Sequence, residues 1–156
     1  MSTAPRNAYL VAHTHWDREW YLPFSRFRVN LVGVVDDILD ALDNDPDVPH
    51  FLLDGQTAVL EDYLAAKPEA RDRINRLVRE GRLAVGPWYI LPDEFLVSGE
   101  ATARNLLLGR QTTPLGQRHA VGYMPDSFGH IAQMPQILQM AGLDNFVFTR
   151  GMDNQA

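Results

Sequence analysis

The chain has 156 residues and a formal net charge of −6, 46% of its residues are hydrophobic, and it contains no cysteine. This composition is ordinary for one globular domain with a sizeable core and gives no sign of disorder or of a membrane span. The acidic balance, with Lys67 as the only lysine among scattered arginines, argues against nucleic acid as a partner, and without cysteine any metal must be held by His and carboxylate side chains.

Short apolar runs alternate with longer stretches of helical spacing, in the order β-α-β-α-β-α-β-α-β. None of the runs shows the alternation of a half-exposed strand, so they predict parallel strands buried on both faces. The predicted strands are residues 8–13, 49–53, 82–88, 119–124 and 145–149. The predicted helical stretches are residues 29–42, 57–80, 100–110 and 134–141, and Gly81 and Gly142 are the expected stops of the second and fourth.

This alternation predicts an α/β fold of right-handed βαβ units, either an open doubly wound sheet or a barrel. Polar and aromatic residues follow every predicted strand. This favours the mouth of a barrel, because an open sheet concentrates functional groups at one switch point. Five strands cannot close such a barrel. The sequence therefore predicts either an open sheet or a piece of a longer protein, and an incomplete barrel would expose apolar edges that favour self-association.

The first predicted strand ends in the motif His13-Thr14-His15-Trp16-Asp17, followed by Trp20. Side chains alternate across a strand, so an extended segment would point His13, His15 and Asp17 to one side. An imidazole and a carboxylate two residues apart can share one metal ion, and the adjacent aromatic faces suit a sugar ring. The alternative is a hydrogen-bonded polar layer that closes the end of a sheet.

The fourth predicted strand ends in Pro125-Asp126-Ser127-Phe128-Gly129-His130. A carboxylate at this position would face the same mouth as His15 and Asp17. The alternative interpretation of Asp126 is an N-cap or turn aspartate before the fourth helix. His130 is expected to support the site from behind rather than to bind a ligand directly.

The two motifs resemble those of the α-mannosidases of glycoside hydrolase family 38. His13-Thr14-His15-Trp16-Asp17 is similar to the family's N-terminal metal motif, and Asp126-Ser127-Phe128-Gly129-His130 is similar to its nucleophile motif. Three segments between them resemble the bacterial members: residues 86–89, 92–95 and 104–109. The resemblance covers residues 8–151 and implies that residues 1–156 are the N-terminal portion of a catalytic domain built as a seven-stranded (β/α) barrel.

The resemblance also implies roles for individual residues. His15, Asp17 and Asp126 match three ligands of a zinc ion, and Asp126 matches the catalytic nucleophile. Trp20 matches an aromatic that packs on the sugar ring, and Phe128 matches an aromatic of the subsite. Arg150 matches an arginine beside the nucleophile; the alternative is a surface arginine paired with Asp153.

Asp93, in the loop after the third predicted strand, is expected to contact the substrate or shape the mouth. The family's fourth metal ligand, a histidine, and its general acid, an aspartate, come later than residue 156. The resemblance therefore implies a metal-dependent retaining α-mannosidase that acts on mannose-containing oligosaccharides or glycosides, and a chain that is inactive by itself. Residues 1–12 lack the apolar core of a signal peptide, so a cytoplasmic protein is expected.

Three alternatives remain at this point. A metal-dependent amidohydrolase also begins with His-x-His at a strand end, but it needs further Lys or His at later strand ends, and Lys67 lies inside a helical stretch. A metal-dependent sugar deacetylase joins His and Asp to zinc, but it uses two histidines a helical turn apart, and the sequence has no such pair. The third alternative is a non-catalytic fragment.

Overall fold

The computed structural model describes residues 7–113 and 121–152. The helices are α1 (Phe24–Asn44), α2 (Ala58–Ala66), α3 (Arg71–Arg79), α4 (Gly99–Thr112) and α5 (Met134–Met140), with a 3₁₀ turn, η1 (Pro68–Ala70). The strands are β1 (Phe51–Leu52), β2 (Leu83–Ala84), β3 (Val121–Met124) and β4 (Asn145–Phe148). The chain is therefore a mixed α/β fold, as predicted. No helix in the described ranges is long and apolar enough to span a membrane.

All strand pairings in the described ranges are parallel. β1 pairs with β2 through Phe51 and Leu83, and β3 pairs with β4 through Val121 and Asn145. An isolated parallel bridge joins His13 to Leu52, so the segment before the first helix runs beside β1. The predicted parallel, sequential arrangement is confirmed within each group. The part of the fourth predicted strand at residues 119–120 lies outside the described residues.

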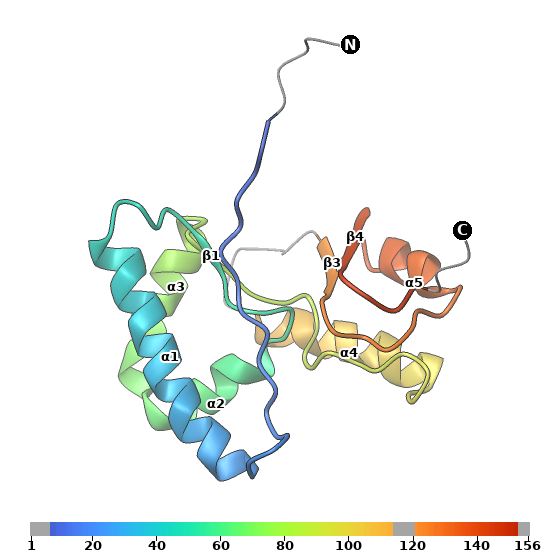
Figure 1. Cartoon of the computed structure of the whole chain (residues 1–156), viewed down its shortest axis with the longest axis horizontal. Helices are drawn as coiled ribbons and strands as arrows, with labels where there is room; N and C mark the ends of the chain where they lie inside the picture. Colours follow the sequence, from blue (N-terminus) through green and yellow to red (C-terminus); the bar gives the residue numbers. More distant parts are fainter. Residues whose placement is uncertain (1–6, 114–120, 153–156) are drawn as a thin grey trace.

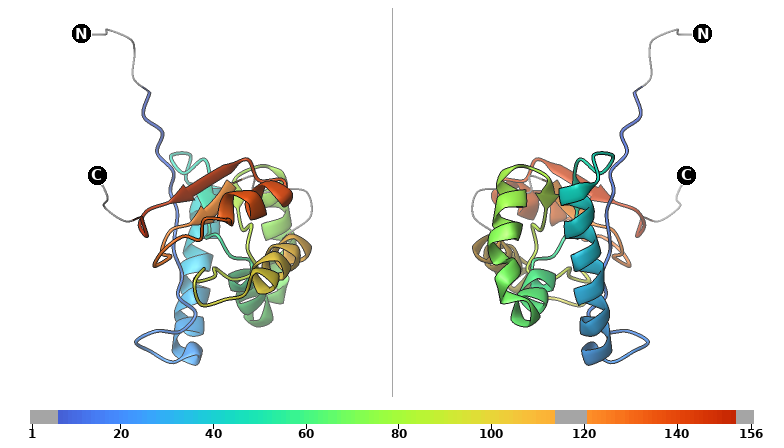
Figure 2. Two further views of the ribbon diagram at one scale, coloured as in Figure 1. Left: turned by 90° about the vertical axis from the view of Figure 1, so that its right-hand side faces the viewer. Right: turned by 90° about the vertical axis from the view of Figure 1, so that its left-hand side faces the viewer.

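The first predicted strand, residues 8–13, is wrong in both length and burial. Only His13 forms a bridge, and Tyr9 and Leu10 are 86% and 95% exposed. Figures 1 and 2 show this segment projecting beyond the rest of the molecule. In the described ranges nothing covers its apolar side chains, so the segment stays extended without the ladder that defines a strand. β4 also differs from the prediction, because Asn145 and Val147 are exposed while Phe146 and Phe148 are half-buried.

The helical stretch at 57–80 divides where Pro68 removes a backbone N–H donor and begins the 3₁₀ turn. Gly81 and Gly142 have φ values of 73° and 77°, the left-handed conformation typical of helix stops, which confirms both predictions. Gly109 lets α4 approach the loop after β2, since a Cβ there would lie 2.3 Å from the carbonyl oxygen of Pro87.

Two hydrophobic clusters form the core. The first packs α1, α2 and α3 on β1 and β2, and its buried residues run from Leu31 to Val85. The second joins Trp88 to α4, β3 and α5, and its buried residues run from Trp88 to Leu143. Figure 1 shows the two groups of elements on opposite sides of the N-terminal segment. The indole N–H of Trp88 donates to the carbonyl oxygen of Tyr123 at 3.2 Å and ties Trp88 to β3 within the second group.

Candidate active site

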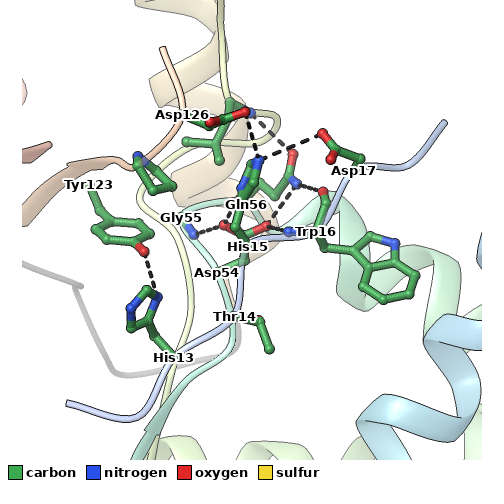
Figure 3. Close-up of polar contacts among 12 residues, drawn as sticks. His13, Thr14, His15, Trp16, Asp17, Asp54, Gly55, Gln56, Tyr123 and Asp126 are labelled. Atoms are coloured by element: carbon green, nitrogen blue, oxygen red, sulfur yellow. Dashed lines mark hydrogen bonds and ion pairs between the residues drawn. The ribbon is translucent and has the colours of Figure 1, made fainter. Parts of the chain in front are cut away.

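The segment that carries His15 and Asp17 is fixed against the loop after β1. The Thr14 hydroxyl donates to the carbonyl oxygen of Leu53 at 2.7 Å, and the Trp16 N–H donates to Oδ2 of Asp54 at 2.9 Å. The Trp16 ring packs edge-on against Phe27 of α1, with centroids 6.0 Å apart. Figure 3 shows His15 and Asp17 turned toward Asp126 and the Trp16 ring turned away. The predicted alternation of side chains is therefore present at these residues.

His15, Asp17 and Asp126 converge although they come from distant parts of the chain. Nε2 of His15 lies 3.6 Å from Oδ1 of Asp17 and 3.7 Å from Oδ2 of Asp126. Asp126 comes from the turn after β3, so the N-terminal segment and the end of β3 face the same pocket, as predicted for the ends of the first and fourth apolar runs. The three side chains are partly exposed at a pocket of about 150 Å³. The pocket is lined by His15, Asp17, Leu91, Pro92, Asp93, Met124, Pro125, Asp126, Ser127 and Phe128.

Asp54 lies behind His15 and is fully buried. Its φ of 145° is unusual for a residue other than glycine. Its carboxylate accepts hydrogen bonds from the N–H groups of Trp16 and Gly55 and from the side-chain amide of Gln56, at 2.9, 2.6 and 2.9 Å. Oδ1 lies 3.7 Å from Nδ1 of His15, a buried atom with no hydrogen-bond partner.

The carboxylates around His15 raise the pKa of its imidazole, and Asp54 contributes most. Burial of the ring opposes this effect, and Asp17 and Asp126 add to it. Sequence reasoning did not select Asp54 as a site residue. The sequence does contain a sign of this role. The polar triplet Asp54-Gly55-Gln56 directly follows the second predicted strand, just as His15 and Asp17 follow the first apolar run.

Arg150 contacts the Asp126 carboxylate directly. Its Nη2 lies 2.6 Å from Oδ1, and its Nε and Nη2 donate to the main-chain oxygen of Asp126 at 3.1 and 2.9 Å. The guanidinium also lies over the Phe128 ring, 3.9 Å from its centroid. The structure thus brings together Asp126, Phe128 and Arg150. The alternative partner of Arg150, Asp153, lies outside the described residues.

The other predicted site residues lie as follows. Asp93 lines the pocket, and its Oδ1 accepts a hydrogen bond from the N–H of Phe128 at 3.3 Å. Trp20 is 73% exposed, packs against Tyr21, and does not line the pocket, so the structure does not bring it to the other site residues.

His13 does not line the pocket. Its Nδ1 is 2.8 Å from the hydroxyl of Tyr123 (Figure 3). Burial, with a smaller effect of the Asp54 carboxylate, raises the pKa of Tyr123 to about 12, so this hydroxyl keeps its proton at neutral pH.

No group of three His, Asp or Glu side chains in residues 7–113 and 121–152 is already arranged to hold a metal ion. The donor set nevertheless has the right chemistry, because His15 presents one ring nitrogen to two carboxylates. Asp54 stands behind the other ring nitrogen, where a carboxylate commonly supports a metal-binding histidine.

Comparisons with known proteins show which family this chain belongs to. The model of the glycosyl hydrolases family 38 N-terminal domain matches residues 5–155. The chain belongs to glycosyl hydrolase family 38.

Relatives of this family 38 chain are much longer proteins. It is 47% identical over 149 residues to a predicted mannosylglycerate hydrolase of Halalkalibacterium halodurans, a match that covers 94% of this chain and 17% of the relative. The crystal structure of an α-mannosidase from Enterococcus faecalis V583 superposes with a TM-score of 0.87 at 45% identity, covering 90% of this chain and 16% of that one. A second family 38 protein from Enterococcus faecalis superposes with a TM-score of 0.76 at 40% identity, with the same coverage.

Proposed function

We propose that the protein is a metal-dependent retaining α-mannosidase and that this chain is the N-terminal part of its catalytic domain, a seven-stranded (β/α) barrel. The observation that carries the proposal is the convergence of His15, Asp17 and Asp126 at one pocket, with Arg150 on the Asp126 carboxylate. Membership of family 38 favours glycoside hydrolysis over the amidohydrolase and deacetylase alternatives. The names of the relatives support mannose-containing substrates.

Asp126 is the proposed nucleophile. In a retaining glycosidase a carboxylate attacks the anomeric carbon, the glycosidic C–O bond breaks, and a general acid about 5–5.5 Å away protonates the leaving oxygen. Water then hydrolyses the resulting glycosyl ester and restores the carboxylate. The guanidinium of Arg150, 2.6 Å from Oδ1, is the direct charged partner of this carboxylate.

His15, Asp17 and Asp126 would hold the divalent cation, which we propose to be zinc. Nε2 of His15 lies 3.6 and 3.7 Å from oxygens of Asp17 and Asp126, and an imidazole nitrogen and carboxylate oxygens are ligand types that zinc binds in proteins. When bound, the cation supplies a Lewis acid that orients the sugar hydroxyls.

The remaining pocket residues support binding of a sugar ring. Phe128 offers an exposed aromatic face beside Asp126, and Asp93 offers a carboxylate to sugar hydroxyls. Trp20 remains the proposed second aromatic contact. The general acid and a fourth metal ligand would come from the part of the relatives' length that this chain does not span, so we propose that the chain alone is inactive.

The proposed function is tested with the full-length protein on an aryl α-mannoside. Hydrolysis with retention at the anomeric carbon is expected, with loss of activity after chelation and recovery on addition of zinc. Mannosylglycerate assayed in parallel tests the substrate named by the relative. A protein that cleaves neither substrate in the presence of zinc would contradict the proposal.

The 156-residue chain is expected to bind zinc weakly, through three protein ligands. Calorimetry should detect this binding, and replacing both His15 and Asp17 by Ala should abolish it, because only Asp126 would remain. The matched control replaces His50 and Asp47, which are exposed and lie outside the pocket, and should leave the affinity unchanged. Equal zinc affinity in the parent and in the His15/Asp17 variant would mean that the metal binds elsewhere.

A further inference from the structure

Glu94 and His130 form a buried pair outside the pocket. Their side chains are 0% and 8% exposed, and Nδ1 of His130 lies 2.5 Å from Oε1 of Glu94. The N–H of Ile131 donates to Oε2 of Glu94 at 2.8 Å. Glu94 belongs to the loop between β2 and α4, and His130 to the loop between β3 and α5. This pair therefore joins two loops whose neighbouring residues, Asp93 and Phe128, do line the pocket.

The other nitrogen of His130 contacts the main chain at the end of β4. Nε2 lies 2.8 Å from the carbonyl oxygen of Arg150. A carbonyl oxygen only accepts hydrogen bonds, so Nε2 must carry the hydrogen. The next residue, Gly151, has a φ of 93°, and a Cβ there would lie 2.9 Å from the main-chain oxygen of Ser127. The segment after β4 thus packs directly on the loop after β3 and is tied to it by His130.

Arg150 gives the two oxygens of the Asp126 carboxylate different partners. Oδ1 is 2.6 Å from the guanidinium, which also donates to the main-chain oxygen of the same residue. Oδ2 faces Nε2 of His15 at 3.7 Å. The position of the Arg150 backbone therefore sets the orientation of the Asp126 carboxylate.

We propose that Glu94 and His130 are positioning residues for the nucleophile. Glu94 sets the ring of His130, the Nε2–H of His130 fixes the carbonyl of Arg150, and the Arg150 side chain holds Asp126 with Oδ2 toward His15. This inference rests on the proposed function, because it treats Asp126 as the nucleophile. Neither Glu94 nor His130 touches the substrate in this scheme.

Two substitutions at His130 separate its two contacts. The amide of His130→Asn can occupy the place of Nδ1, so this variant keeps the contact with Glu94 and loses the donor to Arg150. The amide of His130→Gln can occupy the place of Nε2, so this variant keeps the donor to Arg150. It leaves Oε1 of the buried Glu94 without its contact to residue 130, and only Oε2 keeps a partner, the N–H of Ile131. A buried carboxylate oxygen without a partner is destabilising, so His130→Gln should have the lower Tm.

The experiment measures kcat, KM and Tm of both variants in the full-length protein, with an aryl α-mannoside. His130→Asn is expected to lower kcat by about tenfold to a hundredfold, the usual effect of losing a supporting contact or misplacing a reacting group. His130→Gln is expected to keep a higher kcat than His130→Asn despite its lower Tm. KM should change little in either, because the pocket lining is intact. A purely structural role would make kcat fall in the same order as Tm.

Glu94→Gln provides the conservative control. Its amide can donate to Nδ1 of His130 and leave the hydrogen on Nε2, so kcat should stay within about threefold of the parent, far from the effect of a lost supporting contact. The proposal is overturned if kcat follows Tm across the His130 variants, if neither variant changes kcat, or if Glu94→Gln loses as much activity as His130→Asn. A parent protein without α-mannosidase activity would overturn the proposed function itself, and this inference with it.

Discussion

Replacing Asp126 by Asn in the full-length protein is expected to lower kcat on an aryl α-mannoside by at least about a thousandfold, or roughly 4 kcal/mol. The amide cannot form the glycosyl ester, and it gives up the charged contact with Arg150 at 2.6 Å. The fold should survive, because the Asp126 side chain is 44% exposed. The measurements are kcat and the thermal unfolding temperature of the same preparation.

Asp93→Asn is the matched control for this substitution. Asp93 lines the same pocket, and an amide oxygen can still accept the hydrogen bond from the N–H of Phe128. Its kcat should fall by less than about tenfold, the effect of one weakened contact. A mechanism-based fluoro-sugar should label Asp126 in the parent. A label on Asp93 or Asp17 with Asp126 unmodified would show that the nucleophile is another carboxylate.

Asp54→Ala is expected to destabilise the chain by about 3 kcal/mol or more. The carboxylate is buried and accepts hydrogen bonds from the N–H groups of Trp16 and Gly55 and from the amide of Gln56. Each buried donor left without a partner costs about 1–3 kcal/mol. Urea unfolding of the 156-residue chain measures the change.

Asp17→Ala is the control for stability. Asp17 belongs to the same group of carboxylates, but its side chain is 43% exposed and its contact with His15 is 3.6 Å long. Its removal should change the free energy of unfolding by no more than about 0.5 kcal/mol. Equal unfolding free energies for the two variants would contradict the structural role given to Asp54.

The sequence predicted the order and direction of the elements better than their extent. Apolar runs and glycine stops depend on local chemistry, and the parallel pairings and the stops at Gly81 and Gly142 followed from them. Burial of residues 8–12 depends on which other elements pack against them. The spacing of apolar residues does not identify those elements. The same limit applies to β4, where Val147 is exposed although its run is apolar.

The residues of the site that could be predicted are those that belong to a motif directly after an apolar run. His15, Asp17 and Asp126 meet because the N-terminal segment, which runs parallel to β1, and the turn after β3 end at the same pocket. Asp54 was missed because its role depends on a backbone conformation and on main-chain donors, neither of which can be read from spacing. Glu94 follows Asp93 directly, yet the structure buries it against His130 while Asp93 lines the pocket, because adjacent loop residues point in different directions.

The pocket is lined both by the N-terminal segment and by the loop after β3, and this bears on the order of folding. His15 and Asp17 extend from the first cluster, and Asp126 and Arg150 from the elements around the second. The bond between His13 and Tyr123, close to the site, closes a loop of 110 residues. Closing such a loop costs chain entropy that contacts within each cluster do not, so local packing forms first. Asp126 meets His15 and Asp17 only when the two halves have docked, and the pocket is therefore among the last parts of the chain to form.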